Sequence, residues 1–152
     1  MNWRAFPLAR RHFLAPELVQ TSSMDCGPAS LKCLLEGFGI SISYPRLQEA
    51  CQTDIDGTSI NIIEQIAVRL GLKAQQIMIP VDHLLLSASR ALPALLVTRQ
   101  ANNMLHFLVA WRRHGQIVQV MDPAKGRRWL RGPDLIDEIF VHGQTVCCTA
   151  SS

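Results

Sequence analysis

The stretch Gln20-Thr-Ser-Ser-Met-Asp-Cys-Gly-Pro-Ala29 decides the fold, because it leads from a polar loop into a helix predicted over residues 26–37. Pro28 belongs in the first turn of that helix, where its missing N–H would have no partner in any case. The Cys26 sulfur then lies beside unpaired backbone N–H groups and the positive end of the helix dipole, which stabilise a thiolate. Asp25 opposes this effect unless its carboxylate points away. Cys26 is therefore the candidate nucleophile, although an arbitrary cysteine is more often a small buried residue.

Helices come first in the chain and strands later, which favours an α+β fold. We expect a second helix to start at Ser43. A third helix should be capped by Thr58 or Ser59 and end at Gly71, and a weaker pattern predicts a helix over 81–91. Short apolar runs separated by turn residues then predict an antiparallel meander over 93–98, 106–112, 116–122 and 127–131, followed by a short helix around 135–140. We expect one domain over 1–143 and a flexible tail, or the end of an excised domain, over 144–152.

Composition narrows the class of protein. The chain has 152 residues, 48% of them apolar and 18% charged, which excludes a disordered chain and suits a single domain. No run approaches the roughly 18 uncharged residues that a membrane span needs. A net charge of +3 is too small to argue for nucleic acid, and the arginine pairs Arg10-Arg11, Arg112-Arg113 and Arg127-Arg128 are interpreted as solvated surface.

Five cysteines without a CxxC pair or a secretion signal predict reduced thiols in a cytosolic setting and no zinc site. Cys33 follows Cys26 by two helical turns on the apolar face, so we expect Cys33 and Cys51 to lie in the core. Cys147 and Cys148 fall in the expected tail and have no assigned role. We expect neither a metal nor a cofactor.

A nucleophilic cysteine needs a base, and the base needs a group that orients it. If residues 113–115 form a three-residue hairpin loop, the residue numbers of every cross-strand pair add up to 228. His106 then lies opposite Asp122, within reach of a hydrogen bond. A two-residue loop would shift the pairing by one and place the two side chains on opposite faces. Gln20, six residues before Cys26, could donate its amide to a developing oxyanion, although spacing alone does not identify it.

At these residues the chain resembles the bacteriocin-processing, papain-like cysteine peptidases that remove double-glycine leader peptides. The resemblance covers about residues 18–140. Leu105 departs from the family pattern, which often has asparagine directly before the histidine. The matching residues are Gln20, Asp25-Cys26-Gly27, Ala29, Leu31, Gly57-Thr58-Ser59, Leu70-Gly71, His106-Phe107 and Asp122-Pro123-Ala124-Lys125-Gly126.

The resemblance implies a papain-like fold in which N-terminal helices carry the nucleophile and pack on a C-terminal antiparallel sheet. It implies that Cys26 is the nucleophile, His106 the general base and acid, Asp122 the orienting residue and Gln20 the oxyanion-hole donor. The family's domain is usually the N-terminal part of an ABC transporter, fused to membrane and ATP-binding domains on the cytoplasmic side of the membrane. The partner implied by the resemblance is a precursor peptide with a double-glycine leader. Binding of nucleic acid is not expected, and the isolated domain is expected to be soluble.

Three questions stay open from the sequence. A catalytically silent docking domain that only holds export cargo is an alternative, although a retained Cys26 speaks against it. A thiol acyltransferase on the same fold is a third reading. The chain could be excised from an exporter or free-standing, and its precursor could be a bacteriocin, a lanthipeptide or a signal peptide.

Overall fold

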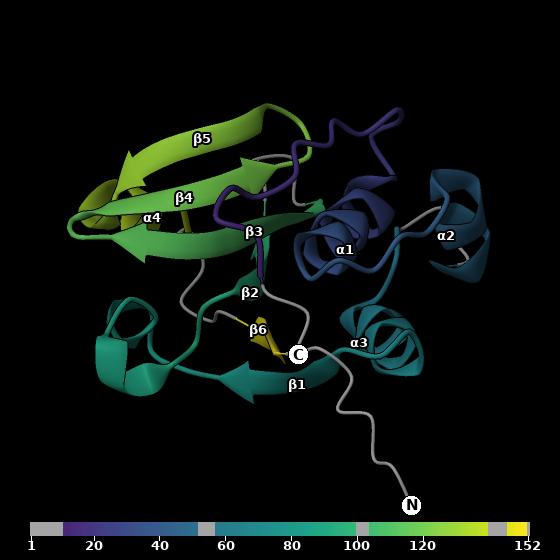
Figure 1. The fold of residues 1–152 in the computed structure, drawn as a ribbon. Helices are drawn as coiled ribbons and strands as arrows, with labels where there is room; N and C mark the ends of the chain where they lie inside the picture. Colours follow the sequence, from purple (N-terminus) through teal and green to yellow (C-terminus); the bar gives the residue numbers. More distant parts are fainter. Residues whose placement is uncertain (1–10, 52–56, 100–103, 140–145, 152) are drawn as a thin grey trace, which may run out of the picture.

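A six-stranded antiparallel sheet runs through the molecule, with helices on both of its faces (Figure 1). The computed structural model describes residues 11–51, 57–99, 104–139 and 146–151. The strands follow the order β1-β6-β2-β3-β4-β5 across the sheet. They are β1 (Lys73–Met78), β2 (Ala94–Arg99), β3 (Leu105–His114), β4 (Ile117–Asp122), β5 (Gly126–Arg131) and β6 (Val146–Ser151).

The helices begin close to where the sequence predicts them. Helix α1 (Cys26–Gly37) has the predicted bounds, and α2 (Tyr44–Cys51) accepts a proline in its first turn. Helix α3 (Ile60–Arg69) is capped by Ser59, whose side-chain oxygen accepts a hydrogen bond from the backbone N–H of Ile62 at 3.3 Å. Helix α4 (Gly132–Ile139) follows β5 directly.

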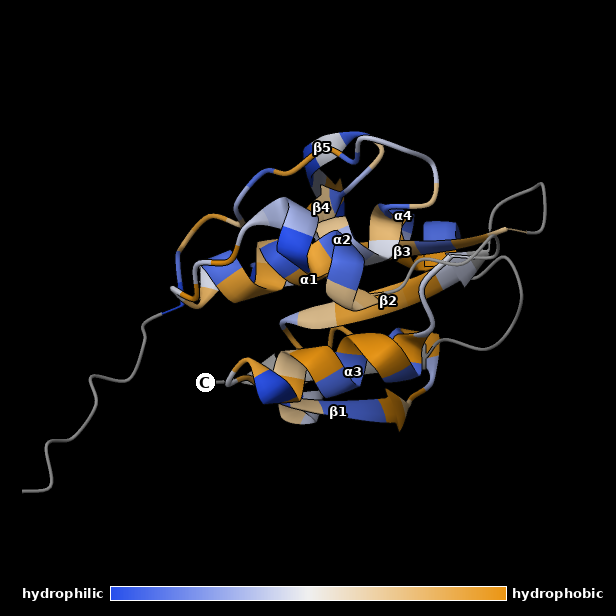
Figure 2. Cartoon of the chain, turned by 90° about the vertical axis from the view of Figure 1, so that its right-hand side faces the viewer, coloured by the Kyte–Doolittle hydropathy of each residue, from blue (hydrophilic) through white to orange (hydrophobic). Residues whose placement is uncertain are grey.

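Each face of the sheet has its own hydrophobic core. Helices α1–α3 cover one face, and in Figure 2 α1 and α3 each carry hydrophobic (orange) and hydrophilic (blue) residues. The segment between β1 and β2, together with α4, covers the other face. Leu95 and Leu96 are adjacent in β2 yet belong to different cores, because neighbouring residues of a strand point to opposite faces. The sheet is therefore buried on both sides at its centre.

Helix α1 is placed on the sheet by a close contact between Gly37 and the buried Trp111 of β3. A Cβ atom at Gly37 would overlap the indole ring, so only glycine lets the helix approach this closely. The Trp111 Nε1–H donates to the backbone oxygen of His12 at 3.1 Å, and the Phe38 ring packs edge-on with centroids 5.7 Å apart. This contact fixes where the N-terminus of α1, and hence Cys26, meets the sheet.

Residues 11–20, which we call the N-terminal strap, cross β3 and β4 before entering α1 (Figure 1). The Arg127 guanidinium donates to the backbone oxygen of Ala15 at 2.6 and 2.9 Å. The buried Gln119 side chain donates to the Phe13 oxygen and accepts from the Ala15 N–H. These bonds align the chain that precedes Cys26 with the strands that carry the other candidate residues.

Two predictions of secondary structure were wrong. The expected flexible tail over 144–152 contains β6, which lies between β1 and β2 and pairs with both. Pairing on two sides satisfies the backbone of a strand whatever its hydrophobic pattern, so a short segment without alternating apolar and polar residues gave no signal of a strand. The expected helix over 81–91 is instead two short 3-10 turns, Val81–His83 and Ser87–Ser89, because Leu84 and Leu85 between them turn into the core.

Candidate active site

Cys26 is the first residue of α1 and is buried, with 5% of its surface exposed. Gly27 permits a tight contact behind it, since a Cβ there would lie 2.9 Å from the Cβ of Thr58. A narrow pocket of about 10 Å³ opens beside the sulfur and is bounded by Thr58, Leu105 and Phe107 among others. The thiol therefore faces a space about large enough for one water molecule.

The Asp25 carboxylate does not cap α1. Its Oδ2 accepts hydrogen bonds from the Thr21 hydroxyl at 2.8 Å and from the Gln48 side-chain amide at 2.9 Å. The backbone N–H groups of the first turn, which favour a negative charge, are thus left free of this carboxylate. Asp25 acts as a link between the loop before α1 and helix α2.

His106 and Asp122 form a buried pair. His106 Nε2 lies 3.0 Å from Asp122 Oδ1, and the two residues are 7% and 3% exposed. The Ala124 N–H also donates to Oδ1, at 2.9 Å. Since Nε2 is occupied by the aspartate, the imidazole presents its other nitrogen, Nδ1, to a second partner.

The predicted register of this hairpin was wrong, although the predicted proximity is confirmed. The loop has two residues, 115–116, and His114 pairs with Ile117. Such a loop alone would have put His106 and Asp122 on opposite faces. A bulge at Trp111 shifts the register by one residue, so that Val109 pairs with Met121. His106 and Asp122 consequently share a face as diagonal neighbours.

Cys26 is the second partner of His106, which hydrogen bonds to both Cys26 and Asp122. Burial lowers the pKa of His106, but the hydrogen bonds to Asp122 and Cys26 and their negative charges outweigh it and raise the pKa to about 9. Burial raises the pKa of Asp122, whereas the bonds from His106 and the Ala124 N–H lower it, with a net decrease. The pair therefore favours an imidazolium beside a carboxylate.

The remaining oxygen of Asp122 faces an arginine that the sequence did not single out. Arg128 Nη1 lies 3.5 Å from Asp122 Oδ2, and the same guanidinium makes a bidentate contact with Glu138 of α4 at 3.1 and 2.6 Å. Arg127 and Arg128 were interpreted as solvated surface, and for both this is wrong. Their neighbours in the sequence gave no signal, because the contacts come from the strap, the end of β4 and α4.

Gln20 is attached to the turn that follows Asp122. Its backbone N–H donates to the Pro123 oxygen at 2.8 Å. The side-chain Oε1 is buried without a partner, and the amide forms no hydrogen bond within the described part of the chain. The segments that carry Gln20 and Asp122 thus meet at one end of β3 and β4. Cys26 lies at the same end because it contacts His106.

The other described cysteines belong to the core, as predicted. Cys33 and Cys51 are fully buried, and burial raises the pKa of their thiols to about 12 and about 11. Neither has a histidine partner among the hydrogen bonds of the described residues. Of the three thiols that the structure describes in full, Cys26 alone contacts an imidazole.

Among the described residues neither a membrane-spanning helix nor a metal-binding cluster is present. No helix there is long and apolar enough to cross a membrane. No group of three or more His, Cys, Asp or Glu side chains in the same residues could hold a metal ion.

Comparison with known proteins identifies the family. The model of the Peptidase C39 family matches residues 16–142. The lactococcin-G-processing and transport ATP-binding protein of Lactococcus lactis subsp. lactis is 29% identical over 110 residues, which are 72% of this chain but only 16% of that protein.

Solved structures agree on the fold. The peptidase domain of Streptococcus ComA, described as a bifunctional ABC transporter of a quorum-sensing pathway, superposes with a TM-score of 0.72 at 20% identity, over 89% of this chain and 98% of that one. A double-glycine-motif protease from an AMS/PCAT transporter, solved with its leader peptide, gives 0.70 at 19% identity, over 91% and 93%. The fold is thus papain-like, as expected, and the chain belongs to the Peptidase C39 family.

Proposed function

We propose that this chain is an active cysteine endopeptidase that removes the leader of a ribosomally made precursor, of bacteriocin or lanthipeptide type, after a double-glycine motif. The observation that carries the proposal is the buried His106, hydrogen bonded to Cys26 on one side and to Asp122 at 3.0 Å on the other. A nucleophile, a base and an orienting carboxylate in this order are the arrangement that acyl transfer requires.

In the proposed reaction the Cys26 thiolate attacks the carbonyl carbon of the residue that ends the leader. The amide of Gln20 and the backbone N–H of Cys26 donate to the resulting oxyanion. His106 gives its proton to the departing amine as the C–N bond breaks and the thioester forms. His106 then takes a proton from water, which attacks the thioester and releases the leader as a free acid. Asp122 holds the imidazole in position throughout, and no step needs a cofactor.

The pocket beside Cys26 supports a preference for small residues. With about 10 Å³ of space between Thr58, Leu105 and Phe107, it has no room for a large side chain next to the scissile bond. Leu105 and Met104 at its edge are 45% and 40% exposed and offer apolar anchors to an amphipathic leader helix. Fusion to the membrane and ATP-binding parts of an exporter, on the cytoplasmic side of the membrane, belongs to the same proposal.

The decisive experiment incubates the chain with a double-glycine precursor and reads the products by mass spectrometry. We expect a leader that ends in a free carboxylate and a core peptide with a new N-terminus. Cys26→Ala should abolish cleavage, and Cys33→Ala, which removes a core thiol from the same helix, should retain it.

Three outcomes would contradict the proposal. Cleavage by Cys26→Ala would exclude Cys26 as the nucleophile. Leader binding without cleavage by the wild type would indicate a silent docking domain. An acyl group found on an amine instead of on water would indicate a thiol acyltransferase.

A further inference from the structure

A basic pocket of about 350 Å³ lies at the turn end of the β3–β4 hairpin, where neither the proposed chemistry nor the family comparison assigns a role. Four arginines line it, contributed by the N-terminal strap, the segment before β2 and the end of β3. Its walls are the leucines of the 84–92 segment. We use the name basic pocket for the site formed by Arg11, Phe13, Leu86, Arg90, Arg112 and Arg113.

The four guanidinium groups have no carboxylate partner among the residues that the structure describes. Two of them are held by aromatic rings, with Arg11 5.5 Å from the centroid of Trp111 and Arg112 5.6 Å from that of Phe13. Arg113 donates to the backbone oxygen of Leu85. These contacts fix the positions of three of the four positive charges without neutralising them.

The guanidinium groups of Arg11 and Arg112 repel each other, and one N–H donor of Arg112 has no acceptor among the described residues. Burial lowers the pKa of Arg11, and the nearby charge of Arg112 lowers it further. Arg112 Nε is buried without a hydrogen-bond partner. An anion in the pocket would relieve the repulsion and accept from this donor, and guanidinium groups match the geometry of phosphate oxygens.

Apolar side chains project around the same pocket. Phe13 and Leu86, which line it, are 63% and 51% exposed. Trp129 and Ile117 continue this exposed surface, since the His114 ring packs against both Phe13 and Trp129 and His114 pairs with Ile117. A small soluble anion would make no use of these protruding side chains, whereas the boundary between lipid headgroups and acyl chains accommodates both arginine and exposed aromatic residues.

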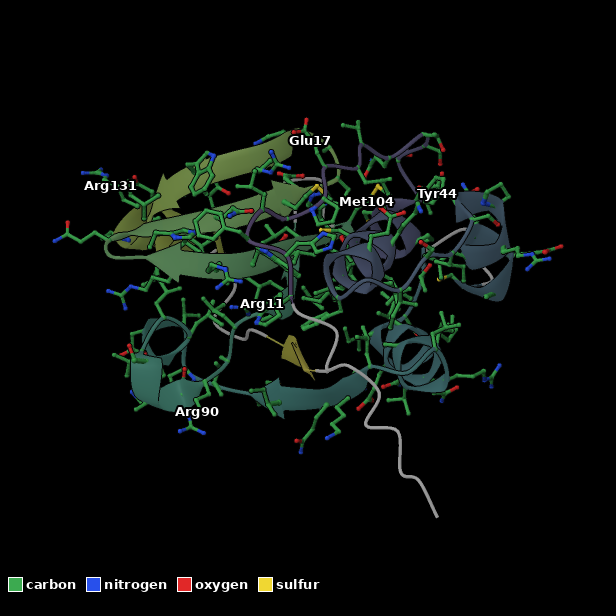
Figure 3. All side chains as sticks on the ribbon, viewed as in Figure 1. Arg11, Glu17, Tyr44, Arg90, Met104 and Arg131 are labelled. Carbon is green, nitrogen blue, oxygen red and sulfur yellow. The ribbon has the colours of Figure 1, made fainter. Side chains whose placement is uncertain are left out.

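We propose that the basic pocket and its apolar edge dock the domain on a bilayer of anionic phospholipid, with headgroup phosphates bound by the arginines. The pocket lies at the opposite end of β3 from His106, since His114 is eight positions further along the strand, about 27 Å in extended conformation. Figure 3 shows Arg90 below and to the left, away from Met104 beside α1. Docking there leaves the Cys26 site open, and the proposal does not depend on proteolysis.

The test is flotation of the full chain with vesicles of phosphatidylcholine alone or mixed equally with phosphatidylglycerol, at physiological salt. We expect binding to the mixed vesicles only. Arg90→Glu with Leu86→Ser should weaken it at least about fivefold, because each arginine near an anionic surface contributes about that factor. Arg69→Glu with Val68→Ser on α3, which makes the same changes on another exposed surface, should bind as the wild type does.

Each other result overturns the proposal. Equal loss of vesicle binding in both double variants would show that the chain is attracted to anionic vesicles by charge alone, without a specific site. Binding of inorganic phosphate by calorimetry without vesicle binding would indicate a soluble anion site. Stronger binding to a peptide of alternating Glu and Leu than to vesicles would indicate a protein partner. Circular dichroism of the variants establishes that each is folded.

Discussion

His106 Nε2 lies 3.0 Å from Asp122 Oδ1 although the two residues are not cross-strand partners. The two-residue turn by itself would place the two side chains on opposite faces, and the bulge at Trp111 shifts the register by one residue and returns them to one face. The contact on which the proposed chemistry depends is therefore set by backbone features at some distance from it.

Replacing Asp122 by asparagine should reduce kcat about 100- to 10,000-fold, since the amide leaves the imidazole without its charge partner and favours the wrong tautomer. Steady-state cleavage of a double-glycine peptide measures the effect. Asp134→Asn is the matched control, because that carboxylate pairs with Arg131 on the surface. Comparable losses in both variants would refute a specific role for Asp122.

The stability of the folded chain should decrease as the pH rises from about 6.5 to about 9. His106 has a pKa of about 9 when folded and 6.5 as its ordinary value, so in this range the native state holds a proton that the unfolded state has lost. Its contribution is complete below about pH 6.5 and disappears through pH 9. Urea unfolding at several pH values measures this dependence, and His106→Gln should flatten it. An unchanged slope in that variant would count against the pair.

Gln20→Ala should lower kcat about 100- to 1,000-fold with little change in KM, because the lost donor acts on the oxyanion and not on the bound substrate. Gln65→Ala on the exposed surface of α3 provides the control. A rise in KM at constant kcat would place Gln20 in substrate binding instead.

Arg128 and Glu138 should shift the alkaline limb of the pH–rate profile in opposite directions. Arg128→Met removes a cation near the pair, which favours the imidazolium and moves the limb upward from about 9. Glu138→Gln frees Arg128 to interact with Asp122 alone and should move the limb downward. NMR titration of the His106 ring measures the same shifts, and changes of equal sign in both variants would indicate only a structural role.

Gly37→Ala should destabilise the fold by about 1–3 kcal/mol, because the new methyl group overlaps the Trp111 ring. Replacing an ordinary helical glycine by alanine would instead stabilise the fold, by up to about 1 kcal/mol. Urea unfolding tests the sign, and combination with Trp111→Leu should remove most of the loss. Additive effects in the double variant would show that the two residues do not interact.

Local signals predicted helices α1 to α4 and the meander from β2 to β5 well, although not the two 3-10 turns over 81–91, because caps, glycines and alternating apolar runs determine these elements within a few residues. Strand β1 has two glutamines at its centre and lies at the edge of the sheet, so it has little hydrophobic pattern. Strand β6 exists through its pairing with β1 and β2, and such pairing between distant segments leaves no trace in either one alone.

Some features of the candidate site could likewise be predicted from the sequence and others could not. The N-terminal position of Cys26 and the complementarity of His106 and Asp122 could be predicted from short stretches. The ion pair of Arg128 with Glu138 could not, because it depends on how α4 packs against β5. The hairpin register also could not, since a bulge has no reliable signal in a single sequence and the assumed loop was one residue too long.

The bulge at Trp111 has a consequence for how this hairpin tolerates changes of length. Adding or removing one residue between His106 and Asp122 would turn one side chain to the far face unless a bulge were gained or lost at the same time. A change of two residues would preserve the shared face. Relatives of this chain can therefore be compared by whether their histidine–aspartate spacing is odd or even, with every odd change requiring a compensating kink in one strand.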